Sequence, residues 1–308
     1  MTLLMVFAGV AGICFPFLLP LIDLVIPLPL AILVRLQSLR RGLFASAAFC
    51  LVLLLLPFPK AATLLLIGQV VPVGLVLGLL FKNHVPAGAG ISISAFILAV
   101  FSLLGFLVAT FGTGGNLSLK EQEEVRRAVE VAADLYARTG ITESLPREEW
   151  EPAFTEAARA AIQLIPAQLV LWSITSAFLS WVILRRIFLR FTHYLPPFPP
   201  FSRWQFPWYI SWGIIGGLGL TLVGDAFSSS QALAAGKNIL FVFCFLYFVA
   251  GLSTGVYYLG KLQTHQAVKW FFVCAAIVYL PAATMFLVAL GIMDSFFNFR
   301  FRTPKRNK

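Results

Sequence analysis

Long apolar runs dominate this sequence, and they constrain its fold more than any other feature does. A transmembrane helix needs about 20 consecutive apolar residues to cross the ~30 Å hydrocarbon core of a bilayer. Of the 308 residues, 59% are hydrophobic and only 12% are charged, and the mean hydropathy is +0.89. A soluble domain carries about a quarter charged residues. The sequence therefore predicts an all-α integral membrane protein, a polytopic bundle of transmembrane helices.

The apolar runs predict about eight spans. They are Leu3–Leu19, Leu43–Leu56, Ala61–Phe81, Gly88–Phe111, Gln163–Leu184, Trp208–Val223, Ile239–Leu259 and Val268–Ile292. No Lys or Arg precedes Arg35, so the first run lacks the charged start of a signal peptide and is expected to remain as a helix. We expect residues 1–308 to form a single membrane domain.

Acidic residues gather in one hydrophilic segment. Ten of the thirteen Asp and Glu residues lie between Glu121 and Glu156. Apolar residues recur there at helical spacing, namely Val125, Ala128, Val129, Ala132 and Leu135, and a second helix is predicted from about Pro146. Residues 116–160 are thus expected to form an extramembrane insertion of amphipathic helices. The insertion either lies on the membrane surface and shields the bundle, or acts as a lid or docking module over an outward-facing pocket.

Basic residues follow a different distribution, and they predict the orientation of the chain. They cluster at Arg35–Arg41, at Arg185–Arg190, at Lys261 and Lys269, and in a basic tail over residues 294–308. Lys and Arg concentrate in short cytoplasmic loops. We therefore expect a multi-pass protein of the bacterial inner (plasma) membrane with a cytoplasmic tail. The net charge of +10 then reflects topology and contact with anionic lipid, and no nucleic-acid partner is expected.

This orientation conflicts with the predicted number of spans. Three spans after a cytoplasmic Arg185–Arg190 loop would place the basic tail outside. Either the apolar stretch from Val268 to Phe297 doubles back near Pro281, or one of the preceding segments does not cross.

No set of residues predicts catalysis. The stretch GVYYLGKL, Gly255–Leu262, has the glycine and lysine spacing of a phosphate loop, but Leu262 replaces the Ser or Thr that would hold magnesium. The three histidines and four cysteines are isolated from one another, without the close spacing of metal sites or redox pairs. We expect no enzyme activity, no cofactor and no metal.

Polar residues inside apolar runs are the candidate substrate-binding residues, because a polar or charged group in the membrane is costly and tends to mark a binding site or pathway. Asp23 lies among Pro20, Pro27 and Pro29, and a segment with three prolines cannot keep a regular hydrogen-bond ladder. Gln69 is an amide well inside a predicted span. Asp225 is either a second candidate or part of an interfacial turn before serines that cap the next helix.

Small residues four positions apart predict close helix packing, because lipid supplies no hydrophobic drive for helix association. Such pairs are Gly74/Gly78, Gly213/Gly217 and Gly251/Gly255, and Ala8 and Gly12 offer a similar face on the first span.

Several stretches together resemble a known family. They are PLPLAILVRLQSLRRG after the first span, the hydrophilic helices before Pro166, FLYFVAGLSTGVYYLGK at Phe245–Lys261, and ALGIMDSFFNFRFR near the end. On these stretches the chain resembles the YybS-like predicted membrane proteins of bacteria, a group defined as a domain of unknown function. Ala250–Gly251 stands where that family more often has a Gln-Gly pair.

The YybS-like family is distantly similar to the S components of energy-coupling-factor transporters. In S components a loop and a short proline-containing helix after the first span help to close the ligand pocket, and small residues on the first span meet the coupling subunit. The resemblance implies that Asp23–Pro29 matches this loop, and that Ala8 and Gly12 match the small face. It also implies partners, namely other membrane subunits or an ATP-hydrolysing transporter module.

Two hypotheses on function follow. The first is a substrate-binding, S-component-like subunit that takes a small molecule in a pocket of its first spans, with Asp23, Pro27, Gln69 and Asp225 as candidate binding residues. The alternative is a structural or regulatory cell-envelope protein that acts through protein partners.

Overall fold

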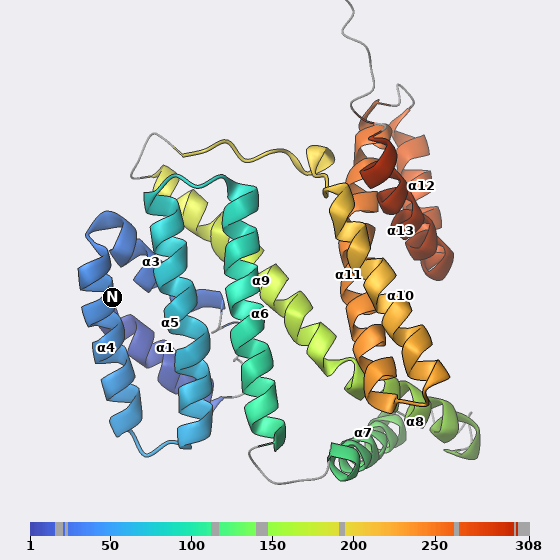
Figure 1. Cartoon of the computed structure of the whole chain (residues 1–308), viewed down its shortest axis with the longest axis horizontal. Coiled ribbons are helices and arrows are strands. Elements are labelled where there is room, and N and C mark those ends of the chain that lie inside the picture. The colour runs from blue at the N-terminus through green and yellow to red at the C-terminus, as the bar shows by residue number, and fades with distance from the viewer. Residues whose placement is uncertain are drawn as a thin grey trace, which may run out of the picture. The chain divides into compact units, whose positions relative to one another are not determined.

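The computed structural model describes residues 1–15, 21, 24–111, 117–139, 147–190, 195–261, 265–298 and 300, and within these ranges every regular element is a helix (Figure 1). The α-helices are α1 (Thr2–Cys14), α3 (Pro27–Leu36), α4 (Leu39–Leu55), α5 (Lys60–Lys82), α6 (Ala87–Phe111), α7 (Leu117–Thr139), α8 (Arg147–Gln163), α9 (Ile165–Leu189), α10 (Ser211–Ala226), α11 (Ser230–Lys261), α12 (Gln266–Val278) and α13 (Leu280–Phe297). Two short 3-10 helices are η3 (Phe201–Arg203) and η4 (Trp208–Ile210). The predicted all-α class is confirmed.

Six of the described helices are long and apolar enough to cross a membrane. They are Thr63–Lys82, Ala87–Val108, Ile165–Leu189, Trp208–Ala226, Ser230–Lys261 and Leu280–Phe297. Of the first predicted span, Leu3–Leu19, the structure describes α1 as far as Cys14, and residues 16–20 lie outside the described part of the chain. α4, at the predicted Leu43–Leu56 span, has 17 residues.

The prediction of Val268–Ile292 as one span is wrong. α12 ends at Val278 and α13 begins at Leu280, and Tyr279 between them has φ −102° and ψ 44°. Pro281 lies in the first turn of α13. A proline in a helix interior would clash with the carbonyl four residues earlier, whereas the first turn of a new helix tolerates it.

The contacts between helices divide the chain after Phe198 into two compact units, which we call unit 1 (from Met1) and unit 2 (from Pro199). The single membrane domain expected from the sequence stays a prediction. Unit 1 contains α1 to α9, and unit 2 contains α10 to α13.

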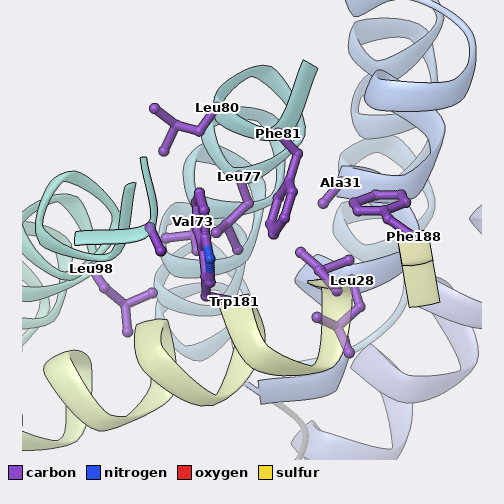
Figure 2. Packing of buried hydrophobic residues seen from close by; sticks show 11 residues of the cluster. Leu28, Ala31, Val73, Leu77, Leu80, Phe81, Leu98, Trp181 and Phe188 are labelled. Carbon is purple, nitrogen blue, oxygen red and sulfur yellow. The ribbon is translucent and has the colours of Figure 1, made fainter. Parts of the chain in front are cut away.

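An aromatic cluster forms the main core of unit 1. Phe81 of α5 stacks on Trp181 of α9 with ring centroids 4.1 Å apart, and it meets Phe188 edge-on at 5.0 Å. Figure 2 shows these rings with Leu28 and Ala31 of α3 beside Phe188. Because lipid tails are as apolar as these side chains, close packing rather than burial from water holds the helices together.

The short helix α3 is buried in unit 1. Six of its ten residues are buried, including both prolines. It packs on α5 where glycines replace side chains: a Cβ at Gly74 would lie 2.9 Å from Leu30 Cδ2, and one at Gly78 would lie 2.8 Å from the Ala31 carbonyl oxygen. Gly74 and Gly78 therefore leave room for α3, which begins at Pro27, to pack closely against α5.

The hydrophilic insertion forms α7 and α8, two helices that contact each other. Val125, Val129 and Ala132 of α7 are buried, whereas Leu135 is 56% exposed. Two exposed ion pairs at helical spacing, Arg127–Glu123 and Arg126–Glu130, lie on α7. The predicted helical spacing therefore holds, except that Leu135 lies outside the buried stripe.

Glycines also set the packing of unit 2. Cβ atoms at Gly224 and Gly236 of the α10–α11 pair would meet backbone atoms of the other helix at 2.5 and 2.7 Å. α11 and α13 cross even more closely: a Cβ at Gly251 would lie 1.9 Å from the Leu287 carbonyl oxygen, and one at Gly291 would lie 2.1 Å from that of Tyr247. At these points helix backbones touch with no side chain between them.

Candidate functional site

The predicted substrate-binding residues lie in different places. Asp23 lies outside the described residues. Pro27 begins α3 and is buried, Gln69 is half-buried in α5, and Asp225 is exposed near the end of α10. Because Pro27 and Gln69 belong to unit 1 and Asp225 to unit 2, only the first two share a unit. Their role in binding stays a prediction.

Gln69 belongs to a polar seam, which we define as Gln69, Ser102 and Ser173, inside unit 1. Its side-chain amide donates to Ser102 Oγ of α6 at 3.4 Å, and Ser102 Oγ lies 3.5 Å from Ser173 Oγ of α9. Ser173 Oγ also lies 2.8 Å from the Leu169 carbonyl oxygen. Ser102 is 7% exposed and Ser173 is fully buried. The seam thus joins α5, α6 and α9 through long, weak hydrogen bonds that leave bonding capacity in each group.

The three seam residues lie at similar distances along their helices from neighbouring helix ends. At 1.5 Å per residue, Gln69, Ser102 and Ser173 lie about 20–24 Å along their helices from Lys82, Ala87 and Leu189, three helix ends on the same side of unit 1. A residue at this distance from a helix end at the membrane surface would lie inside the hydrocarbon region of a ~30 Å core.

Buried serines continue from the seam along α9. Ser176 and Ser180 are each 2% exposed, and Ser180 Oγ donates to the Leu24 carbonyl oxygen at 3.4 Å. Leu24 lies next to Asp23 in the segment that leads into α3. One polar face of α9 therefore runs from Gln69 toward the proline-rich segment, and the sequence analysis did not identify it because serine at helical spacing gives only a weak signal among apolar residues.

Sequence reasoning also missed a buried ion pair in unit 2. Asp294 and Arg300 have side chains that are each 1% exposed, and both Nε and Nη2 of Arg300 donate to Asp294 Oδ2, at 3.0 and 2.7 Å. The guanidinium also donates to the Ser202 and Trp204 carbonyl oxygens and to Ser253 Oγ. Asp294 Oδ1 is buried without a hydrogen-bond partner among the described residues.

We call this ion pair, together with Ser253 and the carbonyls of residues 202–204, the Arg300 knot. Ser253 Oγ lies within 2.7 and 2.9 Å of the Phe201 and Trp204 carbonyl oxygens, and Tyr257 donates to the Arg300 carbonyl. The knot thereby joins the segment before α10, the second half of α11 and the end of α13. The sequence does carry a signal for this pair, because Asp294 lies six residues before Arg300. Arg300, however, was assigned to the basic tail and not paired with Asp294.

The comparisons with known proteins agree with the membrane fold. A family model described as a predicted membrane protein (DUF2232) matches residues 2–295. The chain belongs to this DUF2232 family. It is similar to the uncharacterized protein YybS of Bacillus subtilis (strain 168), with 24% identity over 304 residues that cover 97% of this chain and 92% of YybS. No solved structure matches the chain. The predicted YybS-like family is confirmed, whereas the distant similarity to S components stays a prediction.

The small-residue pairs of this DUF2232 chain differ in how tightly they are packed. Gly251 lies at a backbone-to-backbone contact, whereas a Cβ at Gly255 would meet only Leu287 Cδ2 at 3.9 Å. In α1, Gly12 is buried, and the partly buried Ala8 packs against a core cluster of α1, α3, α4 and α5. The chain itself thus covers part of the face that was predicted for a partner subunit.

Basic residues lie together at one end of unit 1 in the DUF2232 chain. We call this the basic end and define it by Arg35, Arg40, Arg41 and Arg185. Arg35 donates to the Phe81 carbonyl, and its guanidinium lies 4.6 Å from the Phe188 ring centroid. These contacts bring the end of α3, with nearby Arg40 and Arg41, to the ends of α5 and α9. Burial lowers the pKa of Arg35 from its ordinary value, yet a guanidinium stays protonated in proteins. Arg185 Nε is buried there without a hydrogen-bond partner among the described residues.

The chemistry of the polar seam is that of hydrogen bonding. Its amide and hydroxyl groups can donate to and accept from a polar molecule, and none of the three titrates. Among the described residues no group of three or more His, Cys, Asp or Glu could hold a metal ion.

Proposed function

We propose that this DUF2232 protein binds a small polar molecule in unit 1, with the polar seam as the recognition site. The observation that supports the proposal is the junction of Gln69, Ser102 and Ser173, three polar side chains from three membrane helices. A polar group in the membrane is costly, and its hydrogen bonds must be satisfied inside the protein or by a ligand.

We also propose the orientation of the protein in a bacterial inner membrane. The basic end of unit 1 lies in the cytoplasm, because Lys and Arg concentrate on that side. The seam, about 20–24 Å from those helix ends, then lies in the outward half of the bilayer. A ligand would approach from outside, as expected of a substrate-binding subunit that relies on other subunits for energy.

Binding at the seam can be tested on the full-length protein purified in mild detergent. Small molecules released by denaturation are identified by mass spectrometry, and each is added back in a thermal-shift titration. Gln69→Leu and Ser173→Ala remove seam hydrogen bonds and are expected to weaken binding by about fivefold each, since such a bond contributes about 1 kcal/mol. Gln168→Leu is the matched control, because Gln168 is an exposed amide in the same unit.

The outcome separates this function from the alternative. Loss of the retained molecule in Gln69→Leu but not in Gln168→Leu supports the seam as the site. Equal retention of the molecule in both variants would show that the seam is not the binding site. Copurification of envelope proteins alone, with no molecule that shifts the unfolding temperature, favours a structural or regulatory protein that docks partners through α7 and α8.

A further inference from the structure

The stretch from Gln266 to Phe297 is apolar but is not one membrane span. α12 and α13 contact each other and meet at Tyr279. The Tyr279 N–H donates to the Ala275 carbonyl at 3.0 Å, and the Ala283 N–H donates to the Tyr279 carbonyl at 2.9 Å. The turn thus keeps backbone hydrogen bonds of the kind that hydrocarbon surroundings require.

The turn between the two helices is apolar and exposed. Ile277, Val278 and Tyr279 are 65%, 74% and 70% exposed, and Met285 and Phe286 are 77% and 68% exposed. No Asp, Glu, Lys, Arg or His occurs between Lys269 and Asp294. Exposed side chains of this kind in an uncharged stretch match the hydrocarbon core of a bilayer and no aqueous surface.

The far end of α13 returns to the end of α11 from which α12 departs. Arg300, just after α13, bonds Ser253, and Tyr257 bonds the Arg300 carbonyl; both partners lie in the last turns of α11. Arg300 also bonds the Ser202 and Trp204 carbonyls before α10. Since α10 and α11 pack as a hairpin of two candidate spans, the start of α10 and the end of α11 face one side of the membrane.

We propose that α12 and α13 form a re-entrant hairpin whose partner is the hydrocarbon core of the bilayer. The chain enters the membrane after Lys261, turns at Tyr279 inside it, and leaves on the side it entered. The Arg300 knot fixes this exit. Arg300 therefore lies on the same side as Pro199–Pro207, and two crossings by α10 and α11 remove the conflict between the basic tail and the number of spans.

Single-cysteine labelling of the full chain tests this topology. In a variant with Cys14, Cys50, Cys244 and Cys274 replaced by Ser, single cysteines are introduced by Arg203→Cys, Ser230→Cys, His265→Cys, Val278→Cys and Thr303→Cys. A membrane-impermeant maleimide is then applied to membranes of either orientation. Arg203→Cys, His265→Cys and Thr303→Cys are expected to react from one side, and Ser230→Cys from the other. Val278→Cys is expected to react only after detergent is added.

Two results would overturn the hairpin. One is labelling of Thr303→Cys from the side that labels Ser230→Cys, which means that the chain crosses after α11. The other is reaction of Val278→Cys in intact membranes. If the cysteine-free chain does not accumulate, epitopes in the natural chain, one appended after Lys308 and one inserted after Phe227, give the same test. They are expected on opposite sides, and detection on the same side refutes the hairpin. Neither result bears on ligand binding at the seam.

Discussion

The Arg300 knot is a case in which single residues decide the structure. Two charges that are each 1% exposed have lost their water, and only their mutual contact and the surrounding carbonyls compensate for that loss. Removal of one partner of a buried pair leaves an uncompensated charge and costs about 3–5 kcal/mol, whereas replacement of both by apolar residues is often neutral. The pair is therefore a requirement for correct placement of α13 more than a net source of stability.

A first prediction follows for Arg300→Met. This variant leaves Asp294 buried and unpaired, so we expect its free energy of unfolding to fall by about 3–5 kcal/mol. The double variant Asp294→Leu/Arg300→Met is expected to recover most of that loss. Thermal and denaturant unfolding in detergent measures both. As a control, Arg127→Ala removes an exposed pair with Glu123 and is expected to cost less than about 1 kcal/mol. Equal losses in the single and double variants would show that Asp294 is not left as a buried charge.

At Gly251 the space available to a side chain, rather than its charge, decides how a substitution changes stability. A Cβ there would enter the backbone of α13, whereas at Gly255, one turn later, it would only touch Leu287. We expect Gly251→Ala to reduce the free energy of unfolding by about 1–3 kcal/mol, the usual cost of overpacking, and Gly255→Ala to change it little. The same unfolding assay compares them. A similar cost in both variants would mean that α11 and α13 do not cross at Gly251.

At the scale of elements, α3 depends on the groove that α5 offers it. Gly78→Ala would put a methyl group 2.8 Å from the Ala31 carbonyl, so we expect α3 to be displaced and the free energy of unfolding to fall by about 1–3 kcal/mol. Gly216→Ala in α10 is the control, because nothing lies within 4 Å of a Cβ there. Limited proteolysis near Gln37, just after α3, provides a local measurement. Unchanged cleavage in Gly78→Ala would contradict the dependence of α3 on this groove.

Elements were easier to predict from the sequence than contacts were. The boundaries of α5 and α6 follow from apolar runs that end at charged or proline residues such as Lys82 and Pro86, and hydropathy detects such ends directly. Hydropathy could not show the break at Tyr279, because both sides of it are apolar. Nor could it pair Ser102 with Gln69 or Arg300 with Ser253, since those contacts depend on how distant helices rotate against one another.

At the scale of the whole molecule, positive charge is concentrated at the basic end of unit 1, which we propose faces anionic lipid on the cytoplasmic side. A basic residue near such a surface contributes about 1 kcal/mol of attraction at low salt. We expect the protein to unfold at a higher temperature in lipid nanodiscs with anionic lipid than in neutral ones, with the difference reduced at high salt. The double variant Arg40→Gln/Arg41→Gln is expected to lose part of that difference. Arg126→Gln, on exposed α7, is the control; an equal loss there would argue against the basic end of unit 1 as the lipid contact.

The pairing of Asp294 with Arg300 also determines how the proposed hairpin responds to the voltage across an energised membrane. Moving one elementary charge through 100 mV changes the free energy by about 2.3 kcal/mol, which is enough to shift a helix that carries an unpaired charge. The stretch from Trp270 to Met293 carries no charge, and the one carboxylate that follows it is neutralised by its own guanidinium. Beyond Lys269, in the first turn of α12, the natural hairpin therefore carries no unpaired charge on which the electric field could act. Arg300→Met would leave one negative charge at the end of α13, and the position of that helix would then depend on the membrane potential.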